Sequence, residues 1–581
     1  MYQDFFTNNF ILNFLTSFLF LSTCILCSIS VSVTLNNKKI NLLNEFQPII
    51  IFFLIFTFYL FVLNILVICD LHNYFDLVFY IIFSIQILYF LINFNNLTKL
   101  NNSFIKISIK EKIIIFFTFL FFLISILPLS DADSISVMQN SATFIYQEGL
   151  KDVNLNKDIE FTSILGTEIL LIISPILNSD NFGVLLNLFV LIFFITFNLK
   201  KKTNFFLILF SSPLILYFIS TAKLQLFFGI LYLILFIIIN QNLIKNRLDL
   251  FITILLLTFY ASGKTSYILL AAPLYLYLFY TNLNNWKNIL SYSIISFIII
   301  LLPIFIIKQI YFANFFAPFF DNIIGKNNEF YNGYALSLRS SQGWLLNFLD
   351  YKIYLKPFIS LKINEISSSL GLIFLLFLVD LKLLKKTKFF PFVIISLVLL
   401  TGQILPRYYF EAFLIMAYYY NSNNIFFKPI VIAQGCVVLA VSIIYIYISY
   451  VDSAVIHDKS TYMRRFSHSY YNAEEVKKLN LIGNILDVAQ DRPSIFFDKN
   501  LYSFRNLSVL NQINGQDMLN LNNYIKENLI DYIIAHKSTK LPVCLNLREI
   551  GEIYRLDAKR NFLKKNRIRK FNIFSIDNNK C

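Results

Sequence analysis

The sequence predicts an all-α polytopic membrane protein of about 13–14 transmembrane helices, followed by a small C-terminal α/β domain. Three observations support this fold class. Hydrophobic residues make up 57% of the 581 residues, and charged residues only 14%. The apolar residues recur in runs close to the ~20 needed to cross ~30 Å of hydrocarbon. After residue 450 the composition becomes polar, so we expect a membrane domain over residues 1–450 and a soluble domain over 451–581.

Loop charges set the expected orientation of the first helices, which cover residues 10–34, 48–69, 74–94 and 113–130. The first run is too long for a signal-peptide core and lacks a basic segment before it, so we interpret it as a retained helix. Lysines fill the loops after the first and third helices, whereas "CDLHNYFD" after the second has no Lys or Arg. Because basic loops stay inside, the fourth helix runs outward and ends at Asp131 on the outer face.

The same rule orders the rest of the membrane domain. Residues 131–181 form a first large outer loop, in which "GTEILLIISPIL" is too short to span. If it crossed, Lys200 to Lys202 would lie outside, so we predict a re-entrant or interfacial helix there. A second outer loop covers residues 308–362, and both chain ends lie outside. Later helices are expected at 182–198, 204–221, 224–240, 249–263, 265–281, 288–307, 364–381, 389–405, 408–421 and 429–450.

The C-terminal domain is expected to alternate strands with a helix. "PSIFFD" and "LIDYIIAH" have the composition of short strands, and "MLNLNNYIKEN" lies between them with a helical pattern. This alternation predicts a small α/β domain on the extracytoplasmic side.

Charge and motif patterns exclude several function classes. The net charge of +15 is spread over short loops between apolar runs, which orients helices and argues against nucleic-acid binding. None of the four His pairs with Cys or His at metal-ligand spacing. "GKTS" at 263–266 is not a P-loop, because Thr258 stands where that motif needs Gly.

The acidic pair in "PLSDADS", Asp131 and Asp133, is the first candidate site. Carboxylates at a membrane interface pay a desolvation cost and usually have a partner or a role. The pair can hold a divalent cation or supply a general base; alternatively, it simply starts the loop and caps the next helix. Further acidic candidates in the same loop are Glu148, Glu160 and Glu168.

Four cations are expected on the same outer face. They are Lys223 in "STAKLQ", Lys264 in "ASGKTSY", Arg339 in "YALSLRSSQGW" and Arg407 in "ILPRYYFEAF". A single cation at a helix end is usually an anchor. Four of them beside acidic residues suggest an anion site, because ammonium and guanidinium groups suit a phosphate leaving group.

The order of these motifs resembles the GT-C superfamily of membrane glycosyltransferases. "PLSDADS" ends an outward helix, an acidic loop follows, and "STAK", "ASGKTSY", "PRYYFEAF" and a soluble tail come later. The chain is similar to the bacterial branch that includes relatives of the dolichyl-phosphate-mannose–protein mannosyltransferases and the lipid A aminoarabinose transferase. One departure lies just downstream: Val137 and Met138 stand where the bacterial pattern often has a Tyr-His pair.

This resemblance implies a GT-C-like fold and an enzyme, a hexosyl or pentosyl transferase of the bacterial inner membrane. Its donor would be a polyprenyl-phosphate-linked sugar, and its acceptor an envelope glycan, lipid or protein. The transfer would take place at the outer face and invert the configuration at the anomeric carbon. Asp131 matches the catalytic acidic position and Asp133 a second position that binds Mg²⁺ or Mn²⁺ in some members. Lys264 and Arg407, with Lys223 and Arg339, would bind the donor phosphate.

Two rival functions remain open at the level of sequence. An O-antigen polymerase or ligase is also polytopic with a large outer loop, and such enzymes use Arg and His in that loop. Here the loop at residues 308–362 contains Arg339 but no His. A flippase or transporter would place charges inside its spans, for which Asp380 and Glu411 are candidates.

Overall fold

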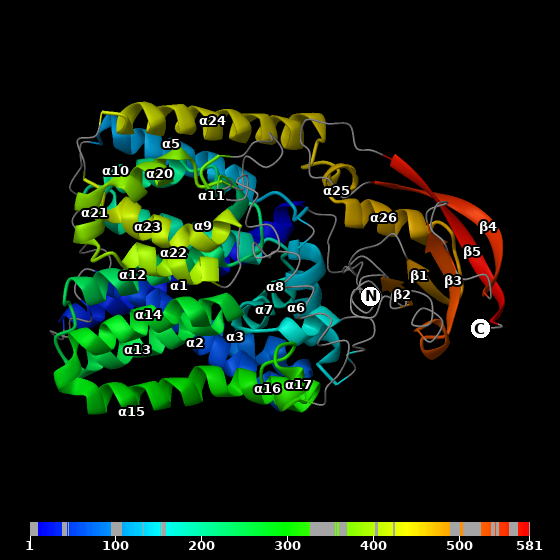
Figure 1. The fold of residues 1–581 in the computed structure, drawn as a ribbon, viewed down its shortest axis with the longest axis horizontal. Helices are drawn as coiled ribbons and strands as arrows, with labels where there is room; N and C mark the ends of the chain where they lie inside the picture. The colour runs from blue at the N-terminus through cyan, green and yellow to red at the C-terminus, as the bar shows by residue number, and fades with distance from the viewer. Residues whose placement is uncertain are drawn as a thin grey trace.

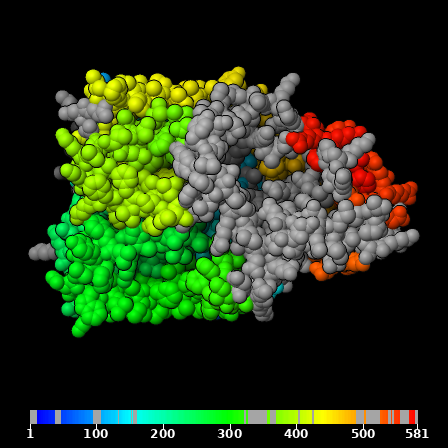
Figure 2. Space-filling model, in the orientation of Figure 1, coloured from blue at the N-terminus to red at the C-terminus, as the bar shows by residue number. Residues whose placement is uncertain are grey.

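The computed structural model describes most of the chain as a helical body with a small sheet at one end (Figure 1). The described residues are 10–37, 43, 46–94, 107–131, 133–151, 153, 159–325, 355, 357–359, 369–400, 405–421, 425–487, 500–503, 524–535, 541, 545–556 and 568–579. The C-terminal strands project from one end of the body in the space-filling view (Figure 2).

The helical body consists of long apolar helices and several shorter ones. The longer elements are α1 (Phe10–Asn37), α2 (Gln47–Ile68), α3 (Phe75–Ile92), α5 (Ile109–Ser125), α9 (Phe182–Asn198), α12 (Gln225–Asn240), α13 (Arg247–Ser262), α14 (Thr265–Thr281), α15 (Trp286–Ser296), α16 (Leu302–Phe312), α22 (Phe390–Leu400) and α24 (Phe427–Tyr447). Shorter elements are α6 (Asn140–Glu148), α7 (Gly166–Leu170), α8 (Ile173–Ile176), α10 (Thr203–Ser211), α11 (Leu214–Phe218), α17 (Asp321–Ile324), α20 (Leu372–Val379), α21 (Leu381–Lys386) and α23 (Phe410–Tyr419).

Five helical segments in the described part are long and apolar enough to cross a membrane. They are Phe10–Asn37, Gln47–Ile68, His72–Ile92, Leu283–Phe312 and Phe427–Asp452. Shorter apolar helices accompany them at Gly166–Ile176, Phe182–Asn198, Gln225–Asn240, Thr265–Thr281 and Phe390–Leu400. These helices indicate a membrane protein, whereas the larger predicted number of full spans stays a prediction.

Burial separates central from peripheral helices. Every residue of α12 from Gln225 to Ile239 is buried, as expected of a helix that is apolar all round and surrounded by others. By contrast, α3 exposes Leu77, Ile81, Ile85 and Leu88. Such a contiguous apolar surface fits contact with lipid.

Two predicted helices differ from the observed ones for local reasons. The predicted helix at 204–221 is divided into α10 and α11, because Ser212 is extended before Pro213, the N-cap residue of α11. The predicted helix at 364–381 ends as α20 at Val379, and Asp380 then caps α21 by accepting hydrogen bonds from the Lys382 and Leu383 amides. The segment "GTEILLIISPIL" at 166–177 forms the two short helices α7 and α8, and its re-entrant or interfacial location stays a prediction.

The C-terminal unit contains α25 (Lys459–Phe466), α26 (His468–Lys477) and a five-stranded sheet of order β2-β1-β3-β5-β4. The strands are β1 (Asn484–Asp487), β2 (Leu501–Ser503), β3 (Ile530–Ala535), β4 (Leu545–Leu556) and β5 (Ile568–Asn579). The strand predicted in "LIDYIIAH" is confirmed as β3, and "PSIFFD" lies outside the described residues. Strands β1, β2 and β3 are parallel, whereas β5 is antiparallel to β3 and β4.

The helical body has two chemically distinct ends. We call one the basic end; it carries described lysines such as Lys110, Lys201 and Lys385, and contacts there include Lys110 Nζ to Asn204 Oδ1 (3.5 Å) and Asn240 Nδ2 to Tyr419 Oη (3.1 Å). We call the other the acidic end, defined by the segment that carries Asp131. The C-terminal unit lies at the acidic end (Figure 1).

Candidate functional site

The acidic pair lies between α5 and a π-helical turn, η3 (Ser134–Gln139), that leads into α6. Asp131 is 6% exposed, and its Oδ2 accepts hydrogen bonds from the Ser134 amide (3.0 Å) and hydroxyl (2.8 Å). Asp131 therefore caps this turn, which agrees with the alternative that the acidic pair starts the loop and caps the next helix. The Ser134 hydroxyl oxygen also accepts from the Ala222 amide (3.0 Å), which ties the pair to the turn before Lys223.

Lys223 lies in the turn between α11 and α12 and faces Asp133. Its Nζ is 2.5 Å from Asp133 Oδ2 and 2.5 Å from Tyr217 Oη. The Lys223 side chain is 6% exposed and that of Asp133 is 35% exposed. Asn187 of α9 holds this turn, because its Nδ2 donates to the carbonyls of Phe218 (3.2 Å) and Lys223 (2.7 Å).

Lys264 lies at the break between α13 and α14, as the sequence predicts. Its Nζ donates to Tyr408 Oη over 3.5 Å. Helix α7 of the acidic loop packs against this break: Thr167 Oγ1 donates to the Gly263 carbonyl (2.5 Å). A Cβ on Gly166 would come within 2.9 Å of the Ser262 carbonyl oxygen, so the close approach needs glycine there.

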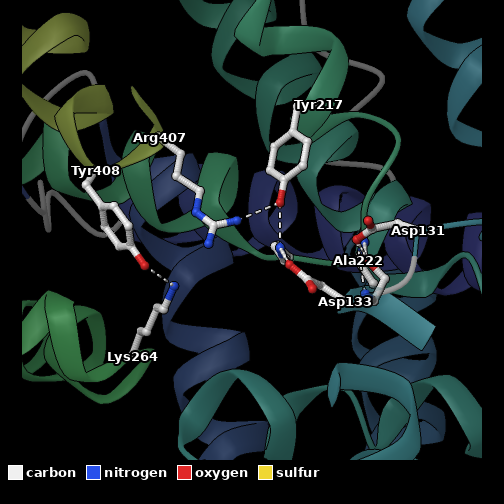
Figure 3. A network of polar contacts seen from close by, with 9 residues as sticks. Asp131, Asp133, Tyr217, Ala222, Lys264, Arg407 and Tyr408 are labelled. Atoms are coloured by element: carbon white, nitrogen blue, oxygen red, sulfur yellow. Dashed lines mark hydrogen bonds and ion pairs between the residues drawn. The ribbon is translucent and has the colours of Figure 1, made fainter. Parts of the chain in front are cut away.

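Arg407 completes the group of cations from the short 3₁₀ turn η9 (Pro406–Tyr409) before α23. Its Nη1 donates to Tyr217 Oη over 2.8 Å, so Tyr217 contacts both Arg407 and Lys223. The Arg407 Nε is buried and has no hydrogen-bond partner among the described residues. Figure 3 shows Asp131, Asp133, Tyr217, Lys264, Arg407 and Tyr408 converging on one region from separate elements.

The cations change the acid–base properties of their neighbours. Burial alone would raise the pKa of Tyr408, but the positive charges of Lys264 and Arg407 outweigh it and lower that pKa to about 8. Burial lowers the pKa of Lys264. In α7, burial raises the pKa of Glu168 to about 7, although the Leu165 amide hydrogen bond and the charges of Lys264 and Lys308 oppose that shift.

The structure brings together most of the predicted site residues but not all of them. Asp131, Asp133, Lys223, Lys264 and Arg407 share one network at the acidic end, and Glu168 is electrostatically coupled to Lys264.

Two of the remaining acidic candidates lie elsewhere. Glu148 ends α6, roughly 20 Å along the helix from Asp133 at 1.5 Å per residue. Glu160 is buried in η4 (Ile159–Ser163), where the Thr162 carbonyl accepts from Lys308 Nζ (3.1 Å). Arg339 lies outside the described residues.

Several residues of this network were missed by the sequence analysis. Tyr217 gave no signal because the chain has 34 tyrosines, and Tyr408 lies in the quoted motif "PRYYFEAF" but was given no role. Ser134 was overlooked because its role depends on contacts with both Asp131 and Ala222. Glu411, considered only as a transport candidate, is buried and accepts a hydrogen bond from Tyr260 Oη (3.0 Å).

The described residues do not offer a ready ligand set for a metal ion. Among them, no three Asp, Glu, His or Cys side chains gather where they could hold one. Mg²⁺ and Mn²⁺ prefer several oxygen ligands, whereas Asp133 contacts the Lys223 ammonium and Asp131 accepts hydrogen bonds from Ser134. Binding of Mg²⁺ or Mn²⁺ by Asp133 stays a prediction, and the function proposed below takes no step through a metal.

The arrangement can bind an anion beside a carboxylate that is partly open to solvent. Three cations approach from the α11–α12 turn, the α13–α14 break and η9, and the acidic pair adjoins them. No protein-family model, no curated protein and no solved structure matches this chain.

Proposed function

We propose that this protein is a GT-C-like membrane glycosyltransferase that moves a sugar from a polyprenyl-phosphate donor to an envelope glycan, lipid or protein. The observation that carries the proposal is the gathering of Lys223, Lys264 and Arg407 beside Asp131 and Asp133 at one end of the helical body. A site at a helix end suits such a donor, because its tail stays among apolar helices while its phosphate meets water.

The cations serve the departing phosphate in this proposal. Arg407 has a buried Nε without a hydrogen-bond partner among the described residues, and Lys264 has one hydroxyl partner at 3.5 Å. Both have donors available for an anion. Preorganised positive charge at the position where negative charge develops is usually the largest contribution to catalysis.

The acidic pair serves the acceptor. The acceptor hydroxyl oxygen attacks the anomeric carbon from the side opposite the phosphate, and its proton passes to one carboxylate of the pair. The bond between the anomeric carbon and the phosphate oxygen breaks, and polyprenyl phosphate leaves with the bonding electrons. The product is a glycoside of inverted configuration.

Orientation and location are part of the proposal. The lysine-rich loops of the basic end favour a cytoplasmic location for that end. The acidic end and the C-terminal unit would then face outward across the bacterial inner membrane. A cysteine introduced at Ser460 should react with an impermeant reagent from outside, whereas one at the exposed Asn242, in the loop between α12 and α13, should not.

The direct test replaces each carboxylate by its amide. Asn caps helices as well as Asp, so Asp131→Asn and Asp133→Asn remove charge with little change to the turn. We expect at least one variant to lose roughly 10²–10⁴-fold in sugar transfer, the usual contribution of a general base.

The matched control is Asp380→Asn, which removes a capping carboxylate from α21. It should transfer sugar at the normal rate. Full activity of both site variants would overturn the proposal. A product of many repeats would instead indicate a polymerase, and movement of the lipid-linked glycan without bond formation a flippase.

A further inference from the structure

Asp180, in the turn between α8 and α9, joins segments that are far apart in the sequence. Its side chain is fully buried, accepts a hydrogen bond from Asn13 of α1 and lies 3.4 Å from Lys459 Nζ of α25. Lys459 is itself buried, at 6% exposure. The C-terminal unit is therefore attached to the helical body through a buried ion pair between residues 279 positions apart.

The same turn contacts both sides of the acidic pair. Gln139, the last residue of η3, donates from Nε2 to the Asp180 carbonyl (3.1 Å) and to Ser174 Oγ (3.0 Å). Asn181 donates from Nδ2 to the carbonyl of Ile126, just after α5 (2.8 Å). Since Asp131 and Asp133 lie between Ile126 and Gln139, any displacement of the turn moves the segment that carries them.

Burial makes this ion pair sensitive to the loss of one partner. A buried carboxylate without its cation is strongly destabilising, whereas removing both charges is often tolerated. Other contacts at this junction are neutral or exposed. Tyr445 Oη of α24 lies 2.9 Å from Tyr462 Oη of α25, Tyr450 Oη donates to the Leu123 carbonyl (2.6 Å), and the ion pair of Arg465 with Asp452 is exposed. Those contacts can keep α25 in place, but they do not reach the Asp180 turn.

We propose that Asp180 and Lys459 are positioning residues, through which the C-terminal unit holds the acidic pair in place for the reaction. The C-terminal unit thus acts as a brace for the site. The inference rests on the proposed function in so far as the positioned carboxylates are the reacting ones.

The test compares Lys459→Met with Lys459→Arg in the full-length protein in membranes. We expect the Met variant to lower kcat roughly 10²-fold, the cost of about 1 Å of misplacement at a reacting group. Affinity for added polyprenyl phosphate should stay within about twofold, because Lys264 and Arg407 are held by other elements and separate sites couple weakly. Lys459→Arg keeps the charge and should restore kcat.

A second readout needs no transferase activity. Hydrogen exchange of residues 133–148 should accelerate in Lys459→Met and return to normal in Lys459→Arg. The control is Lys478→Met, which removes an exposed ion pair with Glu475 in the same unit and should change neither readout. If Lys459→Met fails to fold, the Asp180→Asn/Lys459→Met double variant replaces it, since it leaves no unpaired buried charge.

The outcomes separate the two proposals. Unchanged exchange and kcat in the neutralised variants would overturn the positioning role. Lost activity with unchanged exchange would overturn it too. Faster exchange in a protein whose natural form transfers no sugar would support the brace and reject the proposed function.

Discussion

Lysines at the two ends of the helical body differ in burial, although Lys151 near the acidic end is exposed. At the basic end, Lys201, Lys245, Lys287 and Lys385 are exposed to solvent. At the acidic end, Lys223, Lys308 and Lys459 are buried. The first set keeps its hydration and needs no partner, whereas the second must be paired or hydrogen-bonded to be tolerated.

This difference separates orientation from chemistry. Exposed lysines influence the orientation of the helices through the total number of positive charges on one side of the membrane. Any single one is therefore dispensable. The buried cations lie in defined networks: Lys223 with Asp133 and Tyr217, Lys308 with the carbonyls of Thr162 (3.1 Å) and Ala317 (2.6 Å). We therefore expect function to be sensitive to substitution at the acidic end only.

The largest effect should come from removing a buried cation of the site. Lys223→Met takes away one of three positive charges beside the acidic pair and leaves Asp133 without its partner at 2.5 Å. We expect sugar transfer to fall roughly 10²–10³-fold, as for other losses of a preorganised electrostatic group. Lys201→Met at the basic end is the control. Equal losses of sugar transfer in both variants would contradict the expectation that only the acidic end is sensitive to substitution.

The next effect concerns the dense packing of the acidic end. Gly166→Ala would place a Cβ 2.8 Å from Ser262 Oγ and 2.9 Å from the Ser262 carbonyl oxygen. We expect the free energy of unfolding to fall by about 1–3 kcal/mol, the usual cost of overpacking. Denaturant unfolding in detergent measures it. Gly435→Ala in α24, where a Cβ would meet no atom within 4 Å, should not destabilise the protein.

A smaller effect follows from Tyr408, whose pKa is lowered to about 8 by Lys264 and Arg407. As the pH rises through 8, a phenolate forms and neutralises part of the cation network. Affinity for inorganic phosphate or polyprenyl phosphate should therefore decline several-fold between pH 7 and 9. Tyr408→Phe should reduce this decline to the part that comes from deprotonation of Lys264, whose pKa is lowered by burial; an unchanged pH profile in that variant would contradict the assignment.

The same shift has a consequence for stability. The pKa in the folded state lies below the ordinary value of ~10 for tyrosine, so the deprotonated form is favoured by folding. Tyr408 thus contributes stability that is fully present above pH ~10 and is lost as the pH falls through about 8. Comparing unfolding of the natural protein and Tyr408→Phe at pH 7 and pH 10 checks the sign.

The smallest effect is expected at the basic end. Lys385→Gln removes one exposed charge from the last turn of α21. The free energy of unfolding should change by no more than about 0.5 kcal/mol, as for most surface substitutions. Sugar transfer and the accessibility of a Ser460→Cys label should be unchanged. A marked loss of either would show that single basic-end lysines have a role beyond orientation.

Sequence patterns predicted the helices better than they predicted the contacts between elements. Lys264 falls at a helix break and residues 166–176 are too short to span, and both features are visible in local composition. The division at Pro213 was missed because the apolar run continues through it. Strands β4 and β5 were not predicted at all, because strand formation depends on packing against the neighbouring strands of the sheet.

For the candidate site, too, the sequence suggested individual residues but not the contacts between them. The sequence suggested Asp131, Asp133, Lys223, Lys264 and Arg407 as individual residues on one face. It did not show that Tyr217 joins Lys223 to Arg407, or that Ser134 joins Asp131 to Ala222. These contacts cross between helices, and no local pattern specifies them.

By itself, the sequence determined the class of the molecule, the positions of most helices and the segregation of exposed lysines into particular loops. These properties follow from hydrophobicity and charge, which act residue by residue against water or lipid. Only the tertiary structure decided which cation meets which carboxylate and that Lys459 reaches Asp180. The reason is physical: buried charges persist only where distant segments pack closely enough to replace the water they have lost.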